Sequence, residues 1–293
     1  MSLERLPESE LILNSDGSVY HLHIKDEHVA DTVILVGDQG RVQQVSSHFD
    51  SVDHRIQNRE FITHTGFYKN KRLTVLSTGI GTDNIDIAVN ELDAAVNIDP
   101  VTRTIKTERR KLNLIRIGTS GALQADIPVG SHIVSEFGLG FDGLIYFYNH
   151  SPLPEEKELA EKINTHLAWN SNLSVPYVIK GSVQLLETIG KGMLKGITAT
   201  ASGFYGPQGR RLRLVPKNTN INSQLQSFSY QNKRIVNFEM ETSALYGLGK
   251  LLGHECCTCC VIIANRIRQE YSINAHQEID KLIETVLKRV VNG

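Results

Sequence analysis

Residues 32–41 read TVILVGDQGR, a short apolar run that passes directly into a glycine-containing turn. Apolar runs of this length, bounded by turn residues, are typical of strands buried in a sheet. Three more stretches share the pattern, namely LTVLSTG at 73–79, NLIRIG at 113–118 and TCCVIIAN at 258–265. Each ends in glycine or a polar residue, where a strand gives way to a loop.

Between these runs the apolar residues change to the three-and-four spacing of an amphipathic helix. One such set is Ile85, Ala88, Val89, Leu92, Ala95 and Val96, and a second at the C-terminus is Ile279, Leu282, Ile283, Val286, Leu287 and Val290. Strands that alternate with helices predict the α/β class, with helices on both faces of a sheet.

The composition and net charge limit the kinds of partner that the chain can bind. The chain has 293 residues, 40% of them hydrophobic and 22% charged, which is ordinary for a globular protein. Its net charge of -1 provides no basic field for nucleic acid or a membrane surface, so an anion must be bound by a local cluster of positive groups. The N-terminus MSLERLPESELILNSDGS lacks a signal-type apolar core, and no apolar run spans a bilayer, so we expect a cytoplasmic protein.

The four cysteines stand together in CCTCC, residues 256–260. On a strand, Cys257 and Cys259 point to one face while Cys256 and Cys260 point to the other. Thiolates divided between two faces cannot close around one ion. We therefore predict reduced cysteines that act as small apolar residues of a buried strand, and no metal site.

At two strand ends an arginine lies near a glycine, which leaves the main-chain amides accessible. In GDQGR, Gly37 lets main-chain amides approach an anion and Arg41 can grip it, although many strand-to-helix turns contain glycine. In RIGTSGAL, Arg116 lies within an apolar strand, so it needs either a buried acidic partner or an anionic ligand. Together the two ends suit one phosphate at the carboxyl edge of the sheet.

Three further stretches raise questions. FYGPQGR at 204–210 is a loop that carries two rings, an amide and a guanidinium, as a pocket for a flat polar ring would. In FEMETSALY, Glu239 and Glu241 either favour a helix N-terminus or accept the hydroxyls of a vicinal diol. The charged segment Asp99–Leu112 is interpreted as a solvated extension or a subunit contact rather than a recognition patch.

In chain order, GDQGR, NREF, STGIG, RIGTSGALQ, IPVG, FYGPQGR, FEMETSALY and IIANR resemble the motifs of uridine phosphorylases, in the nucleoside phosphorylase family. The resemblance runs from about His21 to the C-terminal helix. It implies one nucleoside phosphorylase domain over residues 1–293, with residues 1–20 as an N-terminal extension, and a three-layer αβα sandwich around a central mixed β-sheet. The implied enzyme is a pentosyltransferase of pyrimidine salvage, which converts uridine and phosphate to uracil and ribose 1-phosphate.

The resemblance also implies site residues. Phosphate contacts match Gly37, Arg41, Arg116 and Thr119, with Arg59 reaching in from a neighbouring subunit. Ribose contacts match Thr119, Met240 and Glu241, with His21 from the neighbour. Uracil contacts match Phe204, Gln208 and Arg210, with Arg266 near the far edge of the ring. The implied catalytic set is Arg116, Gln208, Arg210 and Glu241, and the protein is expected to be at least a homodimer, built into a hexamer.

Besides the N-terminal extension, the sequence departs from the family in four places, the last of which is Asn84. Gln39 stands where the family usually has proline, Gly206-Pro207 inverts the usual order, and the charged segment is longer than in compact relatives. No metal or organic cofactor is expected, and phosphate is the co-substrate. A monovalent cation beside Glu60 is left open, because Asn84 replaces a serine there.

Three rival functions fit the sequence less well. A purine nucleoside phosphorylase or nucleosidase of the same fold would protonate its base with an aspartate, whereas this chain has Asn265-Arg266, and a neutral amide is no acid. A non-catalytic nucleoside-binding protein could lose the phosphate arginines, yet Arg41, Arg59 and Arg116 are all present. A dinucleotide oxidoreductase would need a glycine fingerprint that TGIGT does not complete.

Overall fold

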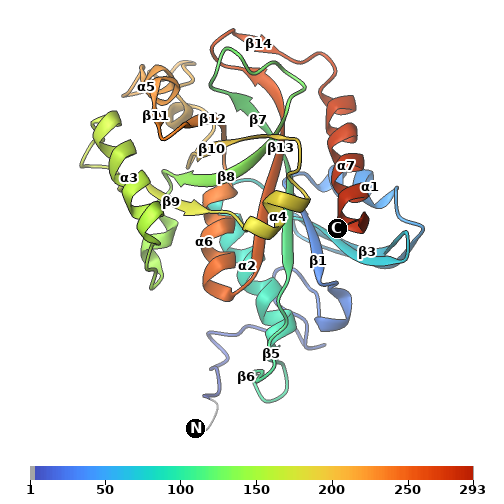
Figure 1. The fold of residues 1–293 in the computed structure, drawn as a ribbon. Helices are drawn as coiled ribbons and strands as arrows, with labels where there is room; N and C mark the ends of the chain where they lie inside the picture. The colour runs from blue at the N-terminus through green and yellow to red at the C-terminus, as the bar shows by residue number, and fades with distance from the viewer. Residues whose placement is uncertain (1–3, 293) are drawn as a thin grey trace. The chain divides into compact units, whose positions relative to one another are not determined.

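A computed structural model describes residues 4–292 of the chain (Figure 1). Residues 1–3, which belong to the predicted N-terminal extension, and Gly293 lie outside the described residues. The chain packs into two compact units. Unit 1 comprises the chain up to Ile80 together with Asn84–Ile115 and Leu248–Glu255, and unit 2 comprises Gly81–Asp83, Arg116–Gly247 and the chain from Cys256 onward.

Unit 1 contains strands in the order β1 (Thr32–Val36), β4 (Lys71–Ser77), β3 (Phe61–Tyr68) and β2 (Ser51–Asn58). β1 and β4 are parallel, and the other two pairings are antiparallel. Helix α1 (Gln39–Ser46) packs against β3 and β4. The remaining elements are the 3-10 turn η1 (Asp26–His28), most of α2 (Thr82–Asn97) and the hairpin of β5 (Ile98–Asp99) with β6 (Thr104–Ile105).

Unit 2 also has a mixed sheet, in the order β11 (Ser229–Tyr230), β12 (Lys233–Glu239), β10 (Leu194–Thr200), β8 (His132–Gly140) and β13 (Glu255–Asn265). β12, β10 and β8 are parallel neighbours, whereas β13 and β11 are antiparallel to theirs. Three further strands pair antiparallel to this set, namely β9 (Tyr177–Lys180), β14 (Glu270–Tyr271) and the end of β7 (Asn113–Ala122).

The helices of unit 2 follow the strands in the alternating order that the sequence predicts. They are η2 (Leu144–Phe147), α3 (Pro154–Leu167), α4 (Val183–Thr188), η3 (Gly206–Gln208), α5 (Ile221–Ser227), most of α6 (Thr242–Leu252) and α7 (Ala275–Asn292). No helix in the described part of the chain is both long and apolar enough to cross a membrane.

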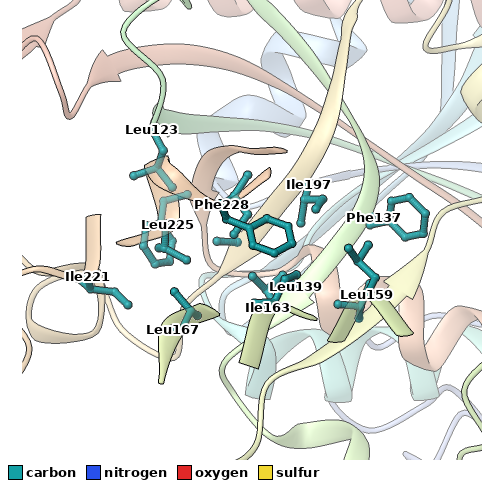
Figure 2. Close-up of a cluster of buried hydrophobic side chains, with 14 of the residues drawn as sticks. Leu123, Phe137, Leu139, Leu159, Ile163, Leu167, Ile197, Ile221, Leu225 and Phe228 are labelled. Atoms are coloured by element: carbon teal, nitrogen blue, oxygen red, sulfur yellow. The ribbon is translucent and has the colours of Figure 1, made fainter. Parts of the chain in front are cut away.

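The core of unit 2 lies on both faces of its strands. On one face, Leu159 and Ile163 of α3 and Leu225 of α5 pack with Phe137, Leu139 and Ile197 of β8 and β10 (Figure 2). Ile235 of β12 belongs to this cluster. The next residue of the strand, Val236, belongs to a second cluster with Ile133 and Ile262. Because successive strand residues point to opposite faces, the second cluster covers the other side.

The predicted strands and helices are confirmed. The apolar runs form β1, β4, β7 and β13, and all six apolar positions of the first helical set are buried in α2. The cysteines of CCTCC are free and buried in β13, as predicted. Burial raises the pKa of Cys260 to about 12, so this thiol stays protonated at neutral pH.

Candidate active site

The two glycine loops of unit 1 lie side by side at the carboxyl ends of β1 and β4. Thr78 N donates to Val36 O at 2.8 Å, and a Cβ added to Gly37 would lie 3.4 Å from the Gly79 carbonyl oxygen. Helix α1 starts directly after this contact, with Asp38 accepting from Gly40 N at 2.9 Å. The structure thus places Gly37 and Arg41 together at a helix N-terminus, which favours an anion.

Arg59 and His21, the residues predicted to serve a neighbouring subunit, also lie close together within unit 1. Arg59 occupies the turn between β2 and β3 with a positive φ of 52°. The adjacent Asn58 donates its side-chain amide to His21 O at 2.8 Å. Glu91 holds the other side of this contact, because it accepts from His21 N at 2.8 Å and lies 2.6 Å from His21 Nδ1.

Arg116, on β7 in unit 2, has buried acidic partners. Its side chain forms an ion pair with Glu241, and its Nη1 lies 3.6 Å from Glu239. Burial opposes the charge, but Glu241 and Glu239 together raise the pKa of Arg116 above its ordinary value. The sequence left open whether Arg116 pairs with an acid or an anion, and the structure shows the acid. We name Arg116, Glu239 and Glu241 the acid–arginine cluster.

Gly118 makes room for this cluster. A Cβ at this position would stand 1.9 Å from Arg116 Nη1 and 3.1 Å from Cys260 Sγ. No side chain fits so close to a guanidinium that two carboxylates already hold. Gly118 of the RIGTSG motif therefore leaves the space that the Arg116 side chain occupies, a role that the sequence did not indicate.

The two carboxylates of FEMETSALY have different tasks. Glu239 accepts hydrogen bonds from Glu241 N and Thr242 N, each at 3.0 Å, and from Thr200 Oγ1 at 2.7 Å. It therefore caps the start of α6, and burial raises its pKa. Glu241 caps nothing with its carboxylate; it accepts from Gly81 N at 2.9 Å and pairs with Arg116. The capping explanation thus fits Glu239 and not Glu241, whose carboxylate is held by Arg116 and Gly81.

Two predicted ribose contacts flank this cluster along the chain. Met240 lies in the bend between the two glutamates and is half-buried. Thr119 follows Arg116 by three positions on β7 and is half-buried as well. Both side chains belong to unit 2, as Glu241 does.

Phe204, Gln208, Arg210 and Arg266 come together in unit 2. Arg210 stacks on Phe204, with its guanidinium carbon 3.7 Å from the ring centroid, and donates to the Phe204 carbonyl at 2.6 Å. It also donates to Gln208 Oε1, and Arg266 donates to the Gln208 carbonyl at 3.2 Å. The structure brings together the four residues that the sequence predicts for uracil, and we call residues 204–210 the base loop.

The backbone of the base loop follows from its inverted Gly206-Pro207. Gly206–Gln208 forms a single 3-10 turn, and Arg210 N returns to Tyr205 O at 2.8 Å. Gly209 then adopts a positive φ of 67°, where a Cβ would lie 2.8 Å from Ile221. The turn buries Gln208, whose exposed fraction is 2%, while the Phe204 ring stays half exposed.

The base loop is electropositive. Burial, and then the nearby Arg266, lowers the pKa of Arg210 to about 10, and burial lowers the pKa of Arg266. Both guanidinium groups still carry their charge at neutral pH. Neither forms an ion pair with a carboxylate among residues 4–292. Two cations beside a buried amide suit a ring whose carbonyl side gains negative charge.

Asn265 is a structural residue. It is 1% exposed, and its amide nitrogen donates to the carbonyls of Gln124 at 3.0 Å and Ile127 at 2.8 Å. Its oxygen accepts from Ile267 N and Arg268 N, each at 2.9 Å. Every polar direction of this side chain is used by the backbone, so it has nothing to offer a purine ring.

The charged segment binds the chain's own N-terminal extension, a use that the sequence analysis did not predict. Arg103, only 9% exposed, donates to the carbonyls of Leu6 and Pro7 at 3.1 Å and to that of Leu11. Lys106 and Arg110 both pair with Asp26. These contacts fix the chain on both sides of His21, the extension before it and Asp26 after it.

Comparison with known proteins agrees with this architecture. The phosphorylase superfamily matches residues 31–293, which is most of the chain. The chain therefore belongs to the phosphorylase superfamily. A uridine phosphorylase of Thermococcus kodakarensis is 29% identical over 282 residues, which cover 94% of this chain and 88% of that protein. A DeoD-type purine nucleoside phosphorylase of Buchnera aphidicola is 23% identical over 281 residues, 94% of this chain and all of that protein.

Among solved structures, a nucleoside phosphorylase of Trypanosoma brucei that shows uridine phosphorylase activity superposes with a TM-score of 0.89 at 27% identity. The match covers 97% of this chain and 100% of that one. These relatives confirm the predicted class: the protein has the mixed α/β fold of nucleoside phosphorylases and is an enzyme of that family. Both pyrimidine- and purine-specific names occur among them.

Proposed function

We propose that the protein catalyses the reversible phosphorolysis of uridine to uracil and ribose 1-phosphate. The observation that carries the proposal is the base loop, where buried Gln208 lies between Arg210 and Arg266, two cations without a carboxylate partner in the described chain. The amide of Gln208 has a donor and an acceptor, as the edge of uracil has. A ring that leaves as an anion is stabilised by such a site.

The chemistry follows from this charge distribution. Uracil is a poor leaving group, so the glycosidic bond breaks ahead of phosphate attack and the base gains negative charge. Arg210 opposes that charge, and preorganised donors are most effective where charge develops in the transition state. Glu241 fixes the ribose hydroxyls, and phosphate held beneath the anomeric carbon by Arg41, Arg59 and Arg116 makes attack effectively intramolecular. The reaction calls for no metal or organic cofactor.

The charge of the acid–arginine cluster bears on phosphate binding. One guanidinium faces two carboxylates, so Arg116 by itself does not provide the net positive charge that a dianion needs. Arg41 at the α1 N-terminus and Arg59 supply it in our proposal. Arg116 then serves as a donor, since its Nε is buried without a hydrogen-bond partner in the described chain.

We further propose that Arg59 and His21 complete the site of a second subunit, in a homodimer that assembles into hexamers. Their close placement in unit 1 supports this, because two residues with one shared destination should lie on one surface. A two-fold contact is self-complementary, so each subunit would complete the site of the other.

The purine alternative has less support. The aspartate that such enzymes need would have to stand at Asn265, whose side chain is fully used by the backbone. The decisive experiment measures phosphate-dependent release of free base from uridine, thymidine, deoxyuridine, inosine and adenosine. Uridine should be preferred, base release should vanish without phosphate, and comparable phosphorolysis of inosine would overturn the proposal.

A further inference from the structure

The geometry points to Tyr20 and Gln39 as positioning residues for Arg59. Tyr20 contacts its guanidinium group, and Gln39 contacts its main-chain carbonyl. This inference rests on the proposed role of Arg59 as a phosphate ligand. Neither residue belongs to the set that the sequence analysis assigned to the site. All three lie in unit 1.

Tyr20 orients the guanidinium. Its ring lies under Arg59, with 5.2 Å between the guanidinium carbon and the ring centroid, and Arg59 Nη2 donates to the Tyr20 hydroxyl at 3.3 Å. The cation–π contact and the hydrogen bond act on the same flat group, so together they restrict its orientation. An exposed arginine without such a support samples many rotamers, so its side chain would have to become ordered when phosphate binds.

Gln39 holds the turn that carries Arg59. Its side-chain amide donates to the Arg59 carbonyl at 3.1 Å. This is the residue of the turn that has a positive φ, a conformation in which a non-glycine residue needs support. Ser77 supports the following residue by donating to Glu60 O at 2.8 Å. Gln39 itself is the first residue of α1, between Gly37 and Arg41 of the predicted phosphate loop.

The same chain also supplies matched controls. Tyr68 at the far end of β3 carries a second cation–π contact, with Lys69 Nζ 5.6 Å from its ring centroid. Gln43, one helical turn after Gln39, accepts from Arg55 on β2 at 3.3 Å. Substituting either residue removes an interaction of the same kind without touching Arg59.

The experiment is a double-mutant cycle read out by calorimetric titration with inorganic phosphate. Tyr20→Ala should weaken phosphate binding about three- to tenfold, and Tyr20→Phe, which keeps the ring, should weaken it less. Gln39→Ala should weaken it about two- to threefold, as for one exposed neutral hydrogen bond. In an Arg59→Ala background neither substitution should change the remaining affinity, because the group they position is gone.

Tyr68→Ala and Gln43→Ala should bind phosphate like the wild type. If Tyr20→Ala leaves the phosphate affinity unchanged, or weakens it equally with and without Arg59, the inference is wrong. Because the readout is phosphate binding, it does not depend on which nucleoside the enzyme accepts. Steady-state kinetics on the preferred nucleoside give a second check, since the phosphate KM should rise while kcat stays within about twofold.

Discussion

Arg116 and Glu241 form an ion pair that is almost entirely withdrawn from solvent, with 5% and 4% of their side chains exposed. Glu239 faces the same guanidinium from 3.6 Å. One substitution here can test stability and phosphate binding separately.

Arg116→Ala should lower the free energy of unfolding by about 3–5 kcal/mol, because it leaves two buried carboxylates without their cation. Phosphate binding should fall as well if Arg116 donates to the anion. Thermal unfolding and phosphate titration measure the two effects. Arg234→Ala is the control, since its pair with Asp126 is solvent-exposed and should contribute at most about 1 kcal/mol. Normal phosphate affinity in Arg116→Ala would reduce this residue to a structural ion pair.

Gln208→Ala should cost about 2–4 kcal/mol of transition-state binding, because it strips a preorganised buried donor from the base loop. The quantity to compare is kcat/KM for uridine. Gln231→Ala, at an exposed glutamine, should leave this value unchanged. A near-wild-type rate for Gln208→Ala would mean that the base loop has another role.

Asn265→Asp should not create a purine phosphorylase. The change replaces a donor to two carbonyls by an acceptor, so it should destabilise the fold by about 1–3 kcal/mol for each hydrogen bond lost. Thermal unfolding and inosine phosphorolysis are the measurements. Appearance of inosine activity near the uridine rate would show that this position can act on a base.

Mixing inactive Arg59→Ala subunits with inactive Glu241→Gln subunits should restore activity. In a mixed dimer one site carries both defects and the other carries neither, so the rate should approach half that of a wild-type dimer. Native mass spectrometry verifies subunit exchange. Absence of recovery despite proven exchange would refute a shared site.

Asp26 should make a contribution to the free energy of unfolding that depends on pH. Burial alone would raise its pKa, but Lys106 and Arg110 outweigh burial and lower it. A carboxyl group whose folded pKa is lowered stabilises the fold above its unfolded pKa, and this contribution is lost as the pH falls through the folded value. Asp26→Asn should therefore cost about 1 kcal/mol at pH 7, discounted for partial exposure. Urea unfolding should show this difference shrinking below about pH 4, and a difference independent of pH would contradict it.

Much of the fold could be predicted because burial leaves a pattern in the sequence. The apolar residues of α2 follow the helical period, whereas β1 and β13 are continuous apolar runs, as expected of strands buried on both faces. The residue types of the base loop indicated that its side chains gather, and the structure does bring Phe204, Gln208 and Arg210 together. That these side chains bind a base stays a prediction.

Other features depend on contacts that leave no local pattern. Glu239 and Glu241 are equivalent by sequence, and only the position of α6 and Arg116 separates a cap from an ion pair. Tyr20 and Arg59 are separated by 39 positions, and nothing near either residue indicates the stack. The grip of Arg103 on the N-terminal extension spans more than ninety positions in the same way.

The contact between Arg103 and the N-terminal extension has an evolutionary consequence. Arg103 recognises the carbonyls of Leu6, Pro7 and Leu11, which every amino acid possesses, so the contact does not depend on which side chains the extension carries. Residues of the extension whose side chains point to solvent are then free to diverge while the arginine that holds them is retained. Homologues should therefore share the arginine and the course of the backbone before they share any recognisable N-terminal motif.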